Sequence, residues 1–277
     1  MKIKFYGTGA SEGFPALFCE CDYCVQARRL GGKNLRTRTS TQIDEHLLID
    51  FSADTNAHAL YGGLDLTQIR YLLVTHSHSD HFYPTDLTTI YPPMADTAPG
   101  RHLEVYGNET VHQDFRQTLP HRMDALSGGL LGFTELKPFE TVQFGGYAVQ
   151  PLPAAHDPAE QCYLYRITKS GKSLLYAHDT AYFPEDTWAA LESGPVLDCV
   201  VLDCTSVGRE KAFDHHMSFA DDRRVRERLL KAGRATEQTH FIATHFAHTF
   251  GPLQETLAKA FAPYGFLPAY DGMELEF

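Results

Sequence analysis

The chain has 277 residues, of which 43% are hydrophobic and 21% charged, a balance typical of a globular protein and not of a disordered one. No run of about 18 apolar residues occurs, and the N-terminus has no long apolar stretch. We therefore expect no transmembrane helix and no signal peptide, and a cytoplasmic location. The formal net charge of −11 argues against broad binding to long nucleic acid or to an anionic membrane.

Strand and helix patterns follow one another along the chain. Strands are predicted at Ile3–Tyr6, Ser40–Ile43, His46–Asp50, Ile69–Thr75, Leu103–Tyr106, Thr141–Phe144, Tyr147–Leu152, Cys162–Thr168, Ser173–Ala177, Cys199–Asp203 and His240–Thr244. Helices are predicted at Tyr23–Leu30, Asp86–Tyr91, Glu109–Thr118, Pro184–Leu191, Phe219–Ala232 and Leu253–Phe261. Strands first outnumber helices and later alternate with them, which predicts two packed sheets with helices outside, an α/β fold. No segment has linker composition, so residues 1–277 are expected to form a single domain.

Residues of the kind that bind metals follow apolar strand runs at three places. YLLVT precedes His76, SLLYA precedes His178 and Asp179, and FIAT precedes His245. Polar side chains at strand ends can converge on one edge of a sheet, where ligands commonly bind in α/β folds.

The segment THSHSDH is the most specific motif of the chain. It supplies His76, His78, Asp80 and His81 on a turn that leaves a predicted strand. Such a turn can direct the first two histidines at one metal ion and the last two residues at a second. Imidazole nitrogen and carboxylate oxygen are ligands that zinc and similar first-row ions prefer.

HSHSDH resembles the HxHxDH signature of the metallo-β-lactamase superfamily, whose fold is a four-layered αβ/βα sandwich. That family completes two metal sites with a histidine, a bridging aspartate and a last histidine, and PLPAAHD, LLYAHDT and IATHFAH match these in order. The resemblance implies one metal ion bound by His76, His78 and His156, a second bound by Asp80, His81 and His245, and Asp179 as the bridge.

Further residues near these motifs are expected to have structural roles. His178 competes with Asp179 for the bridging position, and we interpret it as a neighbour that faces away. In the family that HSHSDH resembles, the aspartate at the position of Asp50 supports the metal loop. Three cysteines in or beside apolar runs are expected in the core: Cys162, Cys199 and Cys204.

A second cluster of metal-type residues lies near the N-terminus. Cys19, Cys21 and Cys24 form C-x-C-x-x-C, three thiolates able to surround one tetrahedral zinc ion, and His248 is available as a fourth ligand. A buried or redox-active cysteine cluster is the alternative. The combination resembles the PhnP-type phosphodiesterases, which implies an N-terminal structural zinc loop around residues 19–24.

The segment DHHMS lies between Asp179 and His245 and contains two further histidines. Related phosphodiesterases place a histidine in this interval that contacts the scissile phosphate. We favour His216 for this role, and His215 remains open. The residues after the histidine depart from the PhnP-type pattern, which leaves the substrate open.

The resemblance implies a phosphodiesterase that acts on a small cyclic or nucleotide-derived phosphodiester. Two divalent ions, zinc or manganese or iron, would activate the attacking water, with Asp80 orienting it and His216 assisting the leaving oxygen. A lactonase or thioesterase on the same scaffold is the alternative, and a non-catalytic metal-binding module is a third reading. The expected partner is a small phosphorylated substrate, neither a membrane nor long nucleic acid, and a homodimer is left open.

Overall fold

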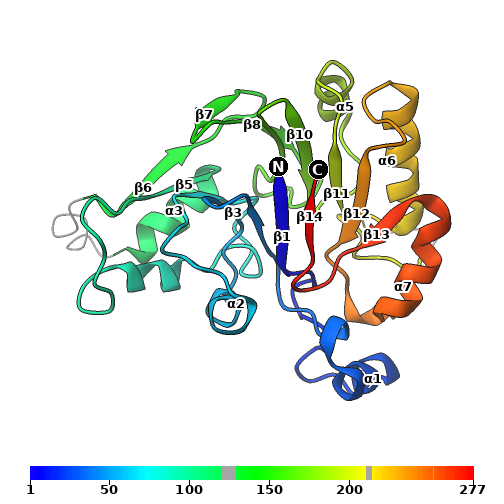
Figure 1. The fold of residues 1–277 in the computed structure, drawn as a ribbon, viewed down its shortest axis with the longest axis horizontal. Helices are drawn as coiled ribbons and strands as arrows, with labels where there is room; N and C mark the ends of the chain where they lie inside the picture. The colour runs from blue at the N-terminus through cyan, green and yellow to red at the C-terminus, as the bar shows by residue number, and fades with distance from the viewer. Residues whose placement is uncertain (120–128, 210–213, 252) are drawn as a thin grey trace.

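The computed structural model describes residues 1–119, 129–209, 214–251 and 253–277, and these form two seven-stranded sheets packed face to face (Figure 1). The first sheet has the order β14 (Glu274–Glu276), β1 (Lys2–Gly7), β2 (Ser40–Ile43), β3 (Leu47–Ile49), β4 (Tyr71–Leu73), β5 (Leu103–Gly107) and β6 (Leu131–Glu135). The second has the order β13 (Phe266–Pro268), β12 (His240–Thr244), β11 (Cys199–Asp203), β10 (Lys172–Ala177), β9 (Tyr163–Lys169), β8 (Tyr147–Pro153) and β7 (Val142–Phe144).

Helices cover the outer face of each sheet. The α-helices are α1 (Asp22–Leu30), α2 (Thr55–Gly62), α3 (Glu109–Thr118), α5 (Glu185–Glu192), α6 (Phe219–Lys231) and α7 (Gln254–Phe261). Short 3-10 helices are η1 (Gly32–Asn34), η2 (Pro84–Ile90), η3 (His248–Phe250) and η4 (Ala262–Tyr264). Helices α5, α6 and α7 lie against the second sheet, and α3 and η2 against the first (Figure 1). The predicted αβ/βα sandwich is therefore confirmed.

Alternation along the strands explains the layers. In β3, Leu47 and Ile49 point into the core between the sheets, whereas Leu48 points into the core under α3 and η2. In β11, Val201 faces the core between the sheets, whereas Val200 and Leu202 pack against α5 and α6. Because parallel strands of this kind are buried on both faces, their sequences are continuous apolar runs, which is why they were predictable.

Most predicted elements are present, and the differences have local reasons. The predicted helix Asp86–Tyr91 is the 3-10 helix Pro84–Ile90, and the strand expected at Ile69–Thr75 pairs only over Tyr71–Leu73. The sequence analysis missed α2, β6, β13 and β14, and also the short 3-10 helices η1, η3 and η4. In α2 only Thr55 and His58 are buried, so it lacks an apolar stripe. Strands β13 and β14 have three residues each, and in β6 only Leu131 is buried, so no apolar alternation marks these strands. The three core cysteines are buried as predicted.

Candidate metal centre

The THSHSDH segment forms a loop that leaves β4 at the edge where β3, β10 and β12 also end. Asp50, fully buried directly after β3, holds this loop. One of its oxygens accepts a hydrogen bond from the Thr75 backbone N–H at 2.8 Å, and the other contacts His81 Nδ1 at 2.7 Å. On the other side, the Glu160 carboxylate accepts bonds from Ser77 N at 2.9 Å and Ser77 Oγ at 2.7 Å. These bonds fix the direction in which the loop histidines point.

The structure brings His76, His78, His156 and Asp179 together, with their candidate ligand atoms all within 4.8 Å of one another. His78 Nδ1 and His156 Nε2 are 3.2 Å apart. The backbone carbonyl of His215 accepts a hydrogen bond from His156 Nδ1 at 3.1 Å. That bond directs the Nε2 lone pair of His156 toward the cluster, as carbonyl partners do for metal-binding histidines.

A second group consists of Asp80, His81, Asp179 and His245, again with ligand atoms within 4.8 Å. His81 Nε2 lies 3.4 Å from His245 Nε2 and 2.9 Å from Asp179 Oδ2. The same Oδ2 atom is 3.3 Å from the Nε2 atom of His76 in the first group. One carboxylate therefore belongs to both groups, the position that the family resemblance implies for Asp179.

The separations within the two groups fit divalent metal ions. Zinc–nitrogen bonds of about 2.0–2.1 Å in tetrahedral geometry place two ligand nitrogens roughly 3.3 Å apart. The nitrogen pairs of 3.2 Å and 3.4 Å match this value. His76 Nε2 is buried without a hydrogen-bond partner among the described residues, as expected of a nitrogen that awaits a metal ion. The residues present therefore fit the implied pair of ions, while binding by each residue stays a prediction.

The electrostatics of the cluster also favour cations. Burial lowers the pKa of His76 and of His156 to about 4, which keeps these imidazoles neutral, the form that binds metals. Burial opposes a charge on His245 as well, but the Asp179 carboxylate outweighs it and raises the pKa of His245 to about 10. Asp179 is itself buried, and the charges of His245 and His81 nevertheless hold its pKa well below the usual range. The Asp179 carboxylate thus attracts positive charge, which a bound cation would supply in place of the proton on His245.

His178 is placed apart from both groups, as expected. Its Nδ1 atom lies 3.2 Å from Thr39 Oγ1 and 3.2 Å from the Tyr176 hydroxyl, and its ring stacks on that of Tyr176. Burial lowers its pKa well below the ordinary value, so it stays neutral. It is a packing residue next to Asp179, which has the left-handed φ of 41° that turns the two side chains apart.

His216 lies beside both candidate metal groups, whereas His215 does not. The ring of His216 is 5.0 Å from that of His156 and 5.8 Å from that of His245, whereas the side chain of His215 is exposed. His216 Nδ1 contacts Asp203 Oδ2 at 2.9 Å. Burial opposes a charge on His216, and the Asp203 carboxylate outweighs it, so the pKa of His216 is raised.

Asp203 and Glu160 are site residues that the sequence analysis missed. Asp203 is fully buried at the end of β11 and also accepts hydrogen bonds from Thr205 N at 2.7 Å and Thr180 N at 3.2 Å. The available signal was an acidic residue that ends an apolar strand run, VVLD, in the same way as LLID ends at Asp50. Glu160 follows no such run, so its role was not readable from the sequence.

The N-terminal cysteines converge with the predicted histidine. Cys19, Cys21, Cys24 and His248 have candidate ligand atoms within 4.8 Å of one another. His248 Nδ1 is 3.5 Å from Cys24 Sγ and 4.0 Å from Cys21 Sγ. Zinc–sulfur bonds of about 2.3 Å and zinc–nitrogen bonds of about 2.0–2.1 Å give a tetrahedral sulfur–nitrogen separation of roughly 3.5–3.6 Å. This donor set fits one structural zinc ion.

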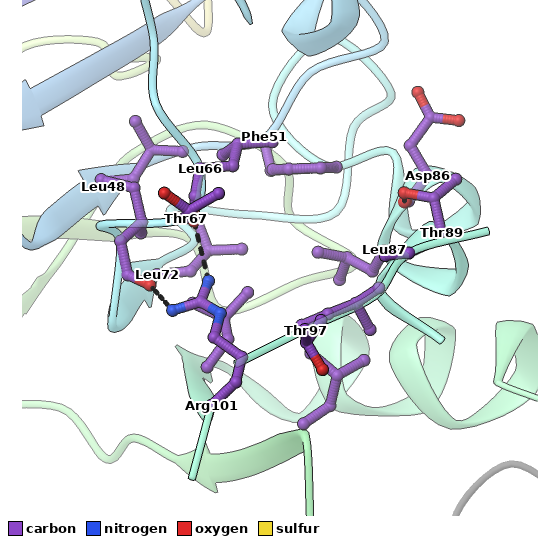
Figure 2. A pocket seen from close by; sticks show the side chains of 15 residues that line it. Leu48, Phe51, Leu66, Thr67, Leu72, Asp86, Leu87, Thr89, Thr97 and Arg101 are labelled. Carbon is purple, nitrogen blue, oxygen red and sulfur yellow. Dashed lines mark hydrogen bonds between the residues drawn. The ribbon is translucent and has the colours of Figure 1, made fainter. Parts of the chain in front are cut away.

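A separate apolar cavity of about 190 Å³ lies on the outer face of the first sheet (Figure 2). Phe51, Leu72 and Leu87 are among its lining residues, and no residue of the two metal groups lines it. The Arg101 guanidinium at its border is held by the backbone carbonyls of Leu66, at 2.8 Å, and Ile69. We therefore assign the chemistry to the His/Asp cluster and not to this cavity.

The αβ/βα sandwich and the His and Asp residues gathered at one sheet edge indicate that this chain is a metal-dependent hydrolase. The chain belongs to the metallo-β-lactamase superfamily, since the model of the beta-lactamase superfamily domain matches residues 46–246. It is 33% identical over 164 residues to an octanoyltransferase of Porphyromonas gingivalis, a match that covers 56% of this chain and spans only 31% of that protein. The aligned part is thus less than a third of that relative's length.

Three solved structures share the fold. A diphosphatase from the PhnP family has a TM-score of 0.73 at 24% identity, covering 100% of this chain and 97% of that one. Zinc-bound PqqB from Methylobacterium extorquens has a TM-score of 0.67 at 16% identity, covering 100% of both chains. The short form of human tRNase Z has a TM-score of 0.67 at 16% identity, covering 100% of this chain and 99% of that one.

Helices in the described ranges are all too short or too polar to cross a membrane.

Proposed function

We propose that the protein is a phosphodiesterase that hydrolyses a small cyclic or nucleotide-derived phosphodiester. The observation that carries this proposal is the position of His216, bound to Asp203 at 2.9 Å beside the shared Asp179 carboxylate. Hydrolysis of a carboxylic ester or thioester does not require an additional cationic imidazole at this place. The likeness to a PhnP-family diphosphatase agrees with phosphoryl chemistry.

The metal ligands would be the two groups described above, His76, His78 and His156 on one side and Asp80, His81 and His245 on the other, with Asp179 shared. When bound, a pair of divalent ions lowers the pKa of a coordinated water and offsets charge on the substrate's phosphate. Zinc, manganese and iron all suit these nitrogen and oxygen donors. The Cys19, Cys21, Cys24 and His248 group would hold a structural zinc ion.

The chain's own residues complete the chemistry. Asp203 binds Nδ1 of His216, and the other ring nitrogen, Nε2, has no hydrogen-bond partner among the described residues. The proton on Nε2 can therefore pass to the leaving oxygen of the phosphodiester or bond to a phosphate oxygen. Asp80 Oδ2 lies 3.5 Å from His81 Nε2 and 3.6 Å from His245 Nε2, at the edge of the cluster, where it can orient the attacking nucleophile.

The test compares His216→Ala with His215→Ala, a matched control whose side chain is exposed. Hydrolysis of 2′,3′-cyclic AMP, whose alkoxide leaving group needs a proton, should fall by about 10²–10⁴-fold in His216→Ala, the usual contribution of a general acid, and stay near wild type in the control. Hydrolysis of p-nitrophenyl acetate should be slow in all three proteins. Wild-type turnover of the acetate alone, or equal phosphodiester rates in both variants, would contradict the proposal.

We also propose that the protein acts on its substrate in the cytoplasm, with neither a membrane nor long nucleic acid as partner. The net charge of −11 supports the second part of this proposal, because membranes and long nucleic acid are bound by basic surfaces.

A further inference from the structure

The excursion between β1 and β2, residues 8–39, borders the metal centre. It leaves and re-enters the first sheet at the edge where the metal-type residues lie. Its Ala10 N–H donates to the carbonyl of Phe246 at 3.2 Å, directly after His245, and its Thr39 hydroxyl lies 3.2 Å from His178 Nδ1. A ligand that occupies this excursion would therefore be a neighbour of the site of hydrolysis.

A cavity of about 560 Å³ lies within this excursion. Its walls are the segment 11–19, the segment 36–38 and the side chain of Asp54. The volume falls in the range of about 300–1,000 Å³ that small-molecule sites commonly have. It is about three times larger than the apolar cavity of Figure 2, at about 190 Å³. The cavity is thus large enough for the organic part of a nucleotide.

Two large apolar side chains stand exposed at this cavity. Leu17 is 82% and Phe18 is 98% exposed, although burial of such side chains normally stabilises a fold by about 1.5–3 kcal/mol. The turn that carries them is firmly held. Arg28 donates hydrogen bonds to the carbonyls of Ala16 at 2.9 Å and Cys19 at 2.8 Å, so the exposed pair is fixed between two braced points. An exposed aromatic ring on a backbone turn that is held in this way is suited to stack on a planar group of a ligand.

Arg38 adds a positive charge to the same cavity. Its Nε and one terminal nitrogen donate to Asp54 at 3.0 Å and 2.6 Å, and Nη1 has no partner among the described residues. The hydrogen bond to Asp54 chiefly raises the pKa of Arg38, and the more distant Asp80 carboxylate contributes. The remaining free nitrogen of Arg38 can bind a phosphate oxygen.

We propose that this cavity is the subsite for the nucleoside part of the substrate, with Phe18 stacking on the base and Arg38 Nη1 binding an oxygen of the phosphate. This inference rests on the proposed phosphodiesterase function and narrows its substrate to a nucleotide-derived diester. Phe18 and Arg38 both line this cavity, from the segments 11–19 and 36–38, so a ligand that fills it would meet both residues.

The test uses two substrates with the same reacting ring, 2′,3′-cyclic AMP and glycerol 1,2-cyclic phosphate, because only the first carries a base. Phe18→Ala should raise KM for cyclic AMP at least about fivefold, as expected for the loss of base–aromatic stacking, with little change for the glycerol ester. Tyr61→Ala is the matched control, since Tyr61 is 88% exposed and lies on α2, outside the cavity lining. Equal effects of Phe18→Ala on both substrates, or none, would overturn the inference.

Two further measurements separate the outcomes. If the wild type hydrolyses neither substrate, the proposed function fails, and calorimetry with AMP and ribose 5-phosphate then tests the subsite alone. Tighter binding of AMP that is lost in Phe18→Ala supports the subsite, and equal binding of both ligands overturns it. Sedimentation of the wild type and of Phe18→Ala tests whether Leu17 and Phe18 instead bind a second copy of the chain. A wild-type dimer that Phe18→Ala dissociates, with an unchanged ratio of KM values, would also overturn it.

Discussion

Replacing Asp203 by Asn should impair hydrolysis without unfolding the protein. The Asp203 carboxylate accepts three hydrogen bonds, from Thr205 N at 2.7 Å, Thr180 N at 3.2 Å and His216 Nδ1 at 2.9 Å. An amide retains only one oxygen, so it cannot accept from both sides. If the oxygen stays on the Thr205 N–H, the amide NH₂ faces His216 and the charge-assisted bond is lost.

The magnitude follows from that lost bond. Hydrogen bonds to charged groups contribute about 1.5–3 kcal/mol, which corresponds to a fall in kcat of roughly 10- to 150-fold if the imidazolium acts in the transition state. KM should change little, because Asp203 is fully buried and does not line a substrate surface. The assay is steady-state hydrolysis of 2′,3′-cyclic AMP, with metal content measured on the same samples.

Two results would refute this reasoning. A normal kcat in Asp203→Asn, with metal content unchanged, would show that the pair with His216 has no part in the reaction. A fall in kcat of the same size in Asp203→Asn on top of His216→Ala would show that Asp203 acts by another route, since residues that act as a unit are not additive. A matched control is Asp198→Asn, whose carboxylate binds Lys172 at 2.9 Å at the opposite end of the same strand region.

Three further predictions concern metals and pH. Elemental analysis should find about three metal ions per chain, of which His78→Ala removes up to two and Cys21→Ala removes one; loss of all ions from either variant would contradict two independent sites. Cys21→Ala should retain phosphodiesterase activity per folded molecule, whereas His78→Ala should lose it, which kinetics on the same samples would show. Burial lowers the pKa of His58 from 6.5 to about 4, so the unfolded chain binds a proton that the folded chain does not. The free energy of unfolding should therefore decrease as the pH is lowered below about 6.5. Between pH 7 and 5 the wild type should lose about 2 kcal/mol more than His58→Gln in urea unfolding with a chelator present, and parallel losses would count against this assignment.

The sequence predicted the parts of the fold that rest on continuous apolar runs. Strands such as β11 and β12 are buried on both faces, so composition alone reveals them. Helix α2 escaped because its contacts are polar: His58 Nε2 lies 2.8 Å from Thr37 Oγ1, a partner far along the chain. Tertiary contacts of this kind leave no periodic signal within a window of sequence.

The site was predictable where residue type and strand end coincide, and less so elsewhere. The predicted ligands gather in two groups because each follows a strand that ends at the same edge. Asp203 satisfied the same rule but lay in no known motif, and Glu160 lies in a loop that only the fold brings to Ser77. Likewise, the choice between His215 and His216 depends on which side chain a loop turns inward, which adjacent identical residues cannot reveal.

The backbone at this edge shows why the cluster is formed before any substrate arrives. Asp50, Asp179 and His245 follow β3, β10 and β12, and all three have left-handed φ values of 62°, 41° and 60°. Non-glycine residues in this region cost about 1–3 kcal/mol each and persist only where their surroundings fix them. Here each strand is paired on both sides, and each side chain is buried with polar partners. The fold therefore holds the candidate ligands in place by packing and hydrogen bonding.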